Sequence, residues 1–273
     1  MVELRRDPDT AAALARLYDV DMLEDPGDLD LYLALATRTG GPILELAAGT
    51  GRIAIPLAKA GYSVVAVDID PAMLARLSDR LADAPEQTRG RVEAVEADLL
   101  GLHLPGGERF KLSILGLNSM LLLDSRAKQR AAVETMARHL LPGGLAVVDV
   151  WLPGPDELSR YDGRLGLEYV RSDPDSGETV AKTTSATYEP AMGTVQLTAL
   201  YEEAAQGGPV RRWIRQDELR LAGAEDLRGM AEEAGLEVEV VAGTYELDPI
   251  GPYDERAILV ARRREGSRSA TLV

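Results

Sequence analysis

Short apolar runs alternate with longer mixed segments along the first 150 residues. The segments between the runs carry apolar residues at helical spacing, and they begin at Arg52, Pro71 and Arg126. Asp70, directly before Pro71, is expected to cap its helix. Continuous apolar strands that alternate with helices are typical of a parallel sheet covered on both faces. The sequence therefore predicts a doubly wound α/β domain. The runs that have the length and composition of buried strands lie at residues 43–46, 64–67, 92–95, 112–117 and 145–150.

Glycine and proline mark the ends of these elements. Gly40, Gly41 and Pro42 separate the first strand from the helices expected over residues 8–38. The helix that begins at Arg126 is expected to reach Leu141 and to end at Pro142-Gly143-Gly144.

A different pattern follows the fifth strand. Residues 167–217 contain no good helix, and runs rich in Thr, Val and Tyr at 179–188 and 194–201 predict a hairpin. A third strand is expected at 209–216. The α/β rhythm then returns with a helix at 225–233 and strands at 236–242 and 256–261.

The chain is therefore expected to form a Rossmann-like, seven-stranded sheet with an antiparallel β insertion after its fifth strand. Its divisions are expected to be an N-terminal helical cap at 1–40, the α/β domain at 41–154 and 219–263, the insertion on the substrate side at 155–218, and a flexible tail at 264–273.

Composition excludes several classes of function. Asp and Glu number 45 against 30 Lys and Arg, so the net charge is −15 and nucleic acid is not an expected partner. There is no cysteine, which excludes disulfides, thiolate metal sites and a cysteine nucleophile. No apolar run is long enough to span a bilayer, and Met1–Asp9 lacks the apolar core of a signal peptide. We expect a cytoplasmic protein that does not bind membranes, and the sequence leaves a homodimer open.

A glycine turn and two acids follow successive strands. Glu45 to Gly51 joins the first strand to a helix, Asp68 ends the second strand and Asp98 follows the third. The glycines admit a ligand close to the backbone, and a carboxylate at a strand tip can accept the hydroxyls of a ribose. These positions indicate an adenosine nucleoside at the carboxyl ends of the strands. Because residues 49–54 also fit the G-x-G-x-x-G/A pattern, a dinucleotide remains an alternative.

Four segments in order resemble the motifs of class I S-adenosylmethionine-dependent methyltransferases. The first is an acid followed by alternating small residues, with Ala47 where the family usually has glycine. The antiparallel insertion is similar to that of glycine and sugar-amine N-methyltransferases. The four segments are Glu45–Gly51, Val65–Leu74, Glu96–Leu99 and His139–Gly144.

The resemblance implies S-adenosyl-L-methionine as cofactor and methyl transfer to a small-molecule amine or hydroxyl. An NAD-dependent oxidoreductase and a non-catalytic nucleoside-binding module remain alternatives. The cofactor-binding residues that it implies are Glu45, Ala47, Gly49, Gly51, Arg52, Asp68, Ile69, Met73, Asp98, Leu99 and Leu115.

Methyl transfer is a direct displacement, for which proximity and orientation can suffice without a catalytic base. His139 and His103 are expected to be structural or on the surface, and no carboxylate cluster has metal-ligand spacing. The polar residues after the fourth strand, Asn118 and Ser119, are expected on the acceptor side. The catalytic candidates are Asn118, Tyr18 and Tyr201.

Overall fold

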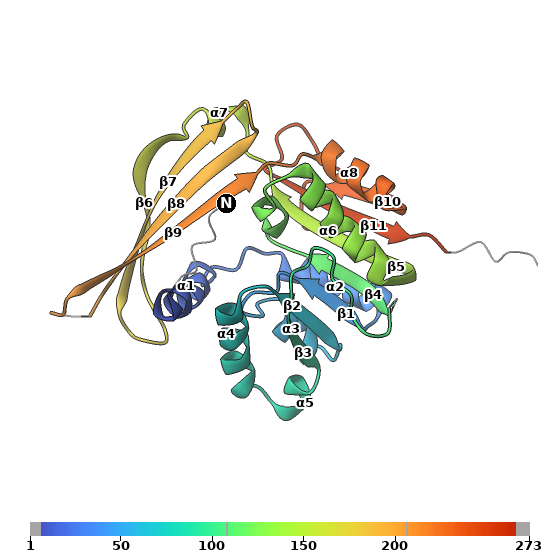
Figure 1. Cartoon of the computed structure of the whole chain (residues 1–273), viewed down its shortest axis with the longest axis horizontal. Coiled ribbons are helices and arrows are strands. Elements are labelled where there is room, and N and C mark those ends of the chain that lie inside the picture. Colours follow the sequence, from blue (N-terminus) through green and yellow to red (C-terminus); the bar gives the residue numbers. More distant parts are fainter. Residues whose placement is uncertain (1–6, 108, 206, 266–273) are drawn as a thin grey trace, which may run out of the picture.

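The computed structural model describes residues 7–107, 109–205 and 207–265, and it contains two sheets (Figure 1). The larger sheet has seven strands in the order β10-β11-β5-β4-β1-β2-β3. Strand β11 runs antiparallel to both of its neighbours, and the others run parallel to one another. This confirms the predicted doubly wound α/β fold. The strands are β1 (Ile43–Leu46), β2 (Val64–Asp68), β3 (Val92–Glu96), β4 (Phe110–Leu115), β5 (Leu140–Trp151), β10 (Leu236–Ala242) and β11 (Arg256–Arg263).

Helices cover both faces of this sheet. Asp70 accepts a hydrogen bond from the Ala72 amide at 2.9 Å, so it caps the helix that Pro71 begins, as the sequence predicts. None of the described helices is both long enough and apolar enough to span a membrane. The helices are α1 (Pro8–Asp21), α2 (Leu29–Thr39), α3 (Ala54–Lys59), α4 (Pro71–Ala82), α5 (Glu86–Arg89), α6 (Arg126–His139), α7 (Pro155–Leu158) and α8 (Ala224–Glu233), with the 3-10 turn η1 (Ser119–Leu122).

The central strands of the sheet carry apolar side chains on both faces, so both faces of these strands are buried. Every residue of β1 and β2 is buried, and the two strands pair with Leu44 beside Val65. Two apolar clusters result, one on each face of the sheet. Burial on both faces explains why these strands are continuous apolar runs in the sequence.

The start of β5 corrects one prediction. Helix α6 ends at His139, and Pro142, Gly143 and Gly144 lie inside β5 instead of ending the helix. Phe110 of β4 already pairs with Leu140, and the register shifts before the next pair, Leu112 with Leu145. The irregularity accommodates the proline and glycines within a paired strand.

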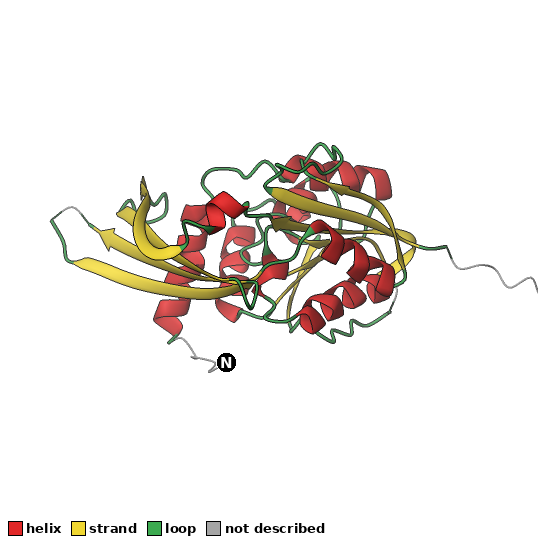
Figure 2. Cartoon of the chain, turned by 90° about the horizontal axis from the view of Figure 1, so that it is seen from above, coloured by secondary structure: helices red, strands yellow, loops and turns green. Residues whose placement is uncertain are grey.

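The insertion forms a separate antiparallel sheet of four strands in the order β6-β7-β8-β9, beside the α/β body (Figure 2). The sequence predicted three of them and missed β6, which is exposed along most of its length and contains two glycines. Such a strand lacks the alternating apolar pattern that sequence prediction depends on. The strands are β6 (Asp162–Ser172), β7 (Thr179–Glu189), β8 (Thr194–Ala204) and β9 (Val210–Arg220).

Helix α1 lies between the insertion sheet and α4 (Figure 1). Its apolar residues pack on the inner face of the sheet, where Tyr201 is buried. Two residues of α1 add polar contacts: Arg16 pairs with the buried Asp173 and Glu203, and Asp21 accepts hydrogen bonds from tyrosines of the sheet. The N-terminal helix therefore joins the two sheets and forms a wall of the space between them. Of the expected flexible tail, residues 266–273 lie outside the described part of the chain.

Candidate functional site

A cavity of about 500 Å³ lies at the carboxyl ends of the parallel strands. Its walls come from the loops after β1, β2, β3 and β4, from α1 and from β9 of the insertion sheet. The residues that line it are Leu14, Ala15, Tyr18, Ala47, Gly49, Val67, Asp68, Ile69, Asp70, Met73, Ala97, Asp98, Leu99, Leu100, Leu117, Ser119, Leu122, Leu123, Asp124, Lys128, Arg215 and Asp217.

Asp68 stands at the tip of β2 with its carboxylate already oriented. One oxygen accepts a hydrogen bond from the Gly49 amide at 2.7 Å, and the other accepts one from the Asp70 amide at 2.8 Å. Burial raises the pKa of this carboxyl, and the backbone donors oppose that effect. Each oxygen retains a free lone pair for a ligand hydroxyl, as a ribose site requires.

The glycine turn has two different physical roles. Gly49 lines the cavity with a φ of +55°, and a Cβ there would meet nothing within 4 Å. Gly51 lines neither this cavity nor its smaller neighbour, and a Cβ there would lie 2.1 Å from a Leu77 methyl carbon. Gly51 therefore lets the turn pack against α4, a role in the fold that differs from ligand contact.

A second, small cavity of about 20 Å³ adjoins the first. Glu45 lines it, is only 3% exposed, and has one carboxylate oxygen that is buried without a hydrogen-bond partner. Burial raises the pKa of Glu45 to about 8, although the charge of Arg52 acts to lower it. A buried acceptor without a partner is costly, so its position beside a cavity suits a ligand that brings a donor.

Arg52 lines the small cavity as well. Its two terminal nitrogens donate to the two carboxylate oxygens of the buried Asp28, each at 2.6 Å. This bidentate pair holds the guanidinium in place beside the glycine turn. Arg52 is thus a fixed cation in a buried ion pair.

Most of the other cofactor residues expected from the sequence meet at the large cavity. Ile69, Met73, Asp98 and Leu99 all line it. Asp98 is exposed, and its carboxylate accepts a hydrogen bond from the Leu100 amide at 2.8 Å. Leu115 lines neither cavity, because it is fully buried in the apolar core beside β5.

These residues fit S-adenosylmethionine. A carboxylate with free lone pairs stands at the strand tip, where a ribose would lie. The unpartnered oxygen of Glu45 could receive an ammonium group, and the main cavity has mostly apolar walls. The observation that decides the fit is the orphaned Glu45 oxygen beside its own small cavity.

The three catalytic candidates are placed differently. Tyr18 lines both cavities. Asn118 lines neither, and its side-chain oxygen accepts a hydrogen bond from the Trp151 amide at 2.6 Å. Its backbone φ of +67° turns the chain after β4. Tyr201 is buried against α1 and donates to Asp21 at 2.7 Å. Of the three, only Tyr18 reaches the cavity.

Four charged residues of the large cavity were missed by the sequence analysis. Asp124 and Lys128 form an ion pair at 2.7 Å before and within α6, and Arg215 and Asp217 form another at 2.7 Å on β9. The alternation of β9 could have indicated that residues 213, 215 and 217 share one face. Nothing in the sequence indicates that this face is turned toward the cavity.

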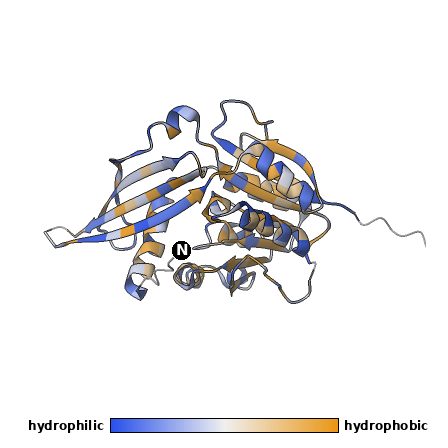
Figure 3. Ribbon diagram, turned by 45° about the horizontal axis from the view of Figure 1, so that its top comes forward, coloured by the Kyte–Doolittle hydropathy of each residue, from blue (hydrophilic) through white to orange (hydrophobic). Residues whose placement is uncertain are grey.

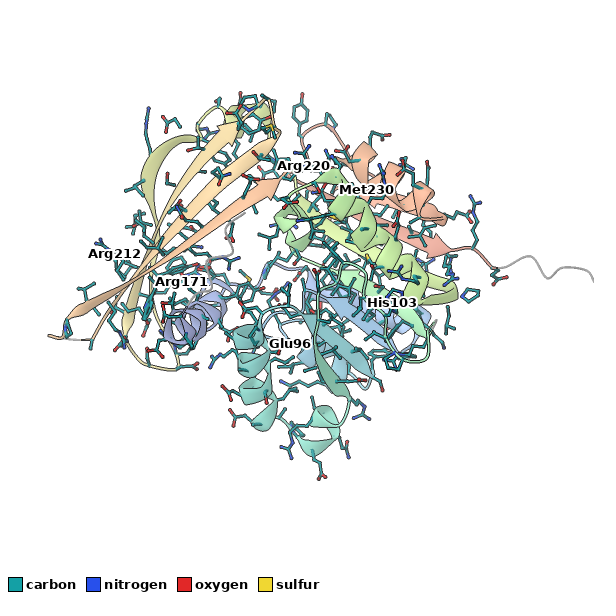
Figure 4. The ribbon with its side chains drawn as sticks, in the orientation of Figure 1. Glu96, His103, Arg171, Arg212, Arg220 and Met230 are labelled. Atoms are coloured by element: carbon teal, nitrogen blue, oxygen red, sulfur yellow. The ribbon has the colours of Figure 1, made fainter. Side chains whose placement is uncertain are left out.

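Neither histidine lies at the cavity. His139 is buried, with one ring nitrogen bonded to the Thr135 carbonyl and the other accepting from the Leu104 amide. His103 is exposed and lies away from the insertion sheet (Figure 4). Within the described ranges, no group of three or more acids and histidines could hold a metal ion.

Comparisons with known proteins agree with this geometry. A family model described as a methyltransferase domain matches residues 43–144. The cypemycin N-terminal methyltransferase of a Streptomyces species is 30% identical over 82% of this chain and 84% of its own length. A dTDP-3-amino-3,4,6-trideoxy-alpha-D-glucopyranose N,N-dimethyltransferase from Streptomyces venezuelae is 25% identical over 82% of this chain and 86% of its own.

The fold has solved counterparts. The CcbJ methyltransferase from Streptomyces caelestis covers 88% of this chain and 97% of its own, with a TM-score of 0.73 and 24% identity. CalS10 from Micromonospora echinaspora, an amino pentose methyltransferase solved with SAM bound, covers 96% and 99%, with a TM-score of 0.64 and 23% identity. These findings favour a methyltransferase over the NAD-dependent alternative. The chain belongs to the S-adenosylmethionine-dependent methyltransferases.

Proposed function

We propose that this enzyme transfers a methyl group from S-adenosylmethionine to an amine of a small molecule, at the junction of the two cavities. Four residues line both cavities and so mark this junction: Tyr18, Ala47, Leu117 and Ser119. This shared lining is the observation that carries the proposal. It puts Tyr18 and Ser119 where a methyl donor and an acceptor could meet.

On the donor side, we infer that Asp68 holds the ribose and that Glu45 receives the amino group of the cofactor. S-adenosylmethionine, when bound, supplies an electrophilic methyl group on a sulfonium. Glu45 is the acid that lines the small cavity, and an ammonium group bound there would favour its ionised form. Both oxygens of the buried Asp28 are already occupied by Arg52. The fixed ion pair of Arg52 keeps this wall rigid, which favours alignment.

On the acceptor side, the proposal assigns no general base. A tyrosine phenol is protonated at neutral pH, and burial raises the pKa of Tyr18 further, so Tyr18 can donate a hydrogen bond. The carboxylates of Asp124 and Asp217 add hydrogen-bond acceptors to the cavity wall. An acceptor that bears N–H groups suits such a wall, and the names of the cypemycin and amino-sugar relatives also describe N-methylation.

The test is a methylation assay of the purified protein with a panel of amines and phenols, with methylated products detected by mass spectrometry. We expect products from amines, and we expect Tyr18→Phe to lower the turnover about tenfold because it removes one hydrogen bond to the reacting groups. Tyr253→Phe is the matched control, since Tyr253 is 94% exposed. Products from phenols alone, or equal effects of the two variants, would contradict the proposal.

A further inference from the structure

Arg215 is a cation of the insertion sheet that faces the site. It lies on β9, opposite Ala199 of β8, and two residues after Trp213, which pairs with the buried Tyr201. Residues 213, 215 and 217 therefore share the inner face of the sheet. The Arg215 side chain is 23% exposed and lines the large cavity together with Asp217.

The hydrogen bonds of Arg215 leave its outer end free. Its Nε donates to Asp217 at 2.7 Å, and no side chain or carbonyl in the described ranges accepts from its two terminal nitrogens. The neighbouring arginines differ, because the terminal nitrogens of Arg211 and Arg212 pair with Glu178 and Glu202. Arg215 thus presents an unused pair of donors to the cavity.

Asp21 is a second carboxylate whose charge acts on Arg215, and both of its oxygens already have partners. One accepts from Tyr169 at 2.5 Å, and the other accepts from Tyr201 at 2.7 Å and contacts Lys182 at 3.1 Å. The carboxylate of Asp21 therefore has its hydrogen-bond partners without the terminal nitrogens of Arg215. They remain available for a ligand.

The free end of Arg215 is a charged donor that can bind an anion. Burial acts to lower the pKa of Arg215, but Asp217 raises it above its ordinary value, so the guanidinium stays charged. Apolar side chains line this cavity together with several aspartates, and a charge interaction formed beside apolar walls is strengthened. The planar fork of a guanidinium matches the two oxygens of a carboxylate or a phosphate.

We propose that Arg215 binds an oxyanion, a carboxylate or a phosphate, that the methyl acceptor carries in addition to its amine. This inference rests on the proposed function and narrows its substrate class to anionic amines. Asp217 is a positioning residue in this site, since its hydrogen bond to Nε turns the free end of Arg215 toward the cavity. The oxyanion would bind beside β9, and the amine would lie at the junction of the cavities.

The test compares matched small amines on the protein saturated with S-adenosylhomocysteine. Two probes carry an anion in addition to the amine, 2-aminoethyl phosphate and β-alanine, and the third, propylamine, carries none. Their dissociation constants are measured by NMR chemical-shift titration. We expect the wild type to bind one of the anionic probes at least about tenfold more tightly than propylamine. The affinities for 2-aminoethyl phosphate and for β-alanine show whether the site prefers a phosphate or a carboxylate.

Three variants connect this preference to Arg215. Arg215→Met should reduce the ratio of affinities to about one, and Arg215→Lys, which keeps the charge without the fork, should give an intermediate ratio. Arg212→Met is the matched control. Arg212 is an odd number of residues from Arg215 on β9, so it lies on the opposite face of the strand, where it pairs with Glu202 and should leave the ratio unchanged. The lysine variant keeps the test valid if the methionine variant does not fold.

Equal binding of anionic and uncharged-tail amines by the wild type would overturn the inference, as would an unchanged ratio in both Arg215 variants. A failure of the proposed function would give a different result: the anionic probes would bind through Arg215, but no amine would be methylated. If uncharged-tail and anionic amines are methylated equally well, the proposed function stands and the anion site is wrong.

Discussion

The two sheets of this protein are stabilised in different ways. The strands of the parallel sheet are mostly hydrophobic, and those of the insertion sheet mix hydrophobic and hydrophilic positions (Figure 3). Strands β1 and β2 are buried throughout, whereas β6 and β9 have no fully buried residue. The first sheet depends on apolar burial, and the second packs on α1 through a small apolar cluster and several charged contacts.

The two sheets contribute different residues to the cavity. The residues proposed to bind the donor stand on loops that follow strands of the apolar core, so their positions follow from local sequence and strand order. The residues proposed for the acceptor side come from α1, η1, α6 and β9, and they meet because the insertion sheet packs on α1 and against η1. Changes to the charged contacts of α1 should therefore affect the insertion first, and changes at the strand tips should affect donor binding.

The largest expected effect is the loss of stability when Arg16, which pairs with Asp173 and Glu203, is replaced. These carboxylates are 1% and 0% exposed, so Arg16→Met leaves two buried charges without their cation. We expect the free energy of unfolding to fall by about 3–5 kcal/mol, measured by denaturant titration. The control is Arg38→Met, whose partner Glu239 is partly exposed, and it should cost less than about 1 kcal/mol. Equal losses would show that the insertion does not depend on buried ion pairs.

The next effect is a pH dependence at Glu45. Its pKa is raised by burial from 4.5 to about 8, so the folded state holds a proton that the unfolded state has released. The stability from this proton is present below about pH 4.5 and is lost as the pH rises toward 8. Glu45→Gln cannot ionise, so its stability relative to the wild type should increase by about 3 kcal/mol between pH 5 and pH 8.

Unfolding of both proteins at several pH values measures this difference. A constant difference between Glu45→Gln and the wild type across that range would show that Glu45 is already ionised in the folded protein. The same measurement with S-adenosylhomocysteine present should reduce the pH dependence, because an ammonium donor stabilises the ionised carboxylate.

The smallest effect is at Asp68. Asp68→Ala removes the carboxylate proposed to bind the ribose, so affinity for S-adenosylhomocysteine should fall by about 1–3 kcal/mol, measured by calorimetric titration. Asp98→Ala is the comparison, and a smaller loss is expected because Asp98 is exposed. Unchanged affinity in Asp68→Ala would refute the ribose assignment. A loss of stability without a loss of affinity would show that Asp68 serves only to hold the turn through its hydrogen bonds to the backbone.

Local patterns in the sequence were enough to predict the parallel sheet and to point to the residues proposed for the donor side of the cavity. Each depends on residues close together in the chain: continuous apolar runs, the turn at Gly49, and acids directly after strands. Local patterns also predicted the Asp70 cap, because a cap and its helix are neighbours in sequence. They could not predict β6, whose residues are exposed and whose only order comes from pairing with β7.

The residues proposed for the acceptor side could be identified only from the packing of elements that are distant in the chain. Tyr18 and Tyr201 were equal candidates in the sequence, but Tyr18 faces the cavities and Tyr201 is committed to Asp21. Arg215 and Asp217 carried no sequence signal, since a charged pair on a strand is ordinarily a solvated surface. Their importance arises because β9 packs beside α1 and turns one of its faces inward. Contacts between residues almost 200 positions apart fix that packing, and no local pattern encodes such contacts.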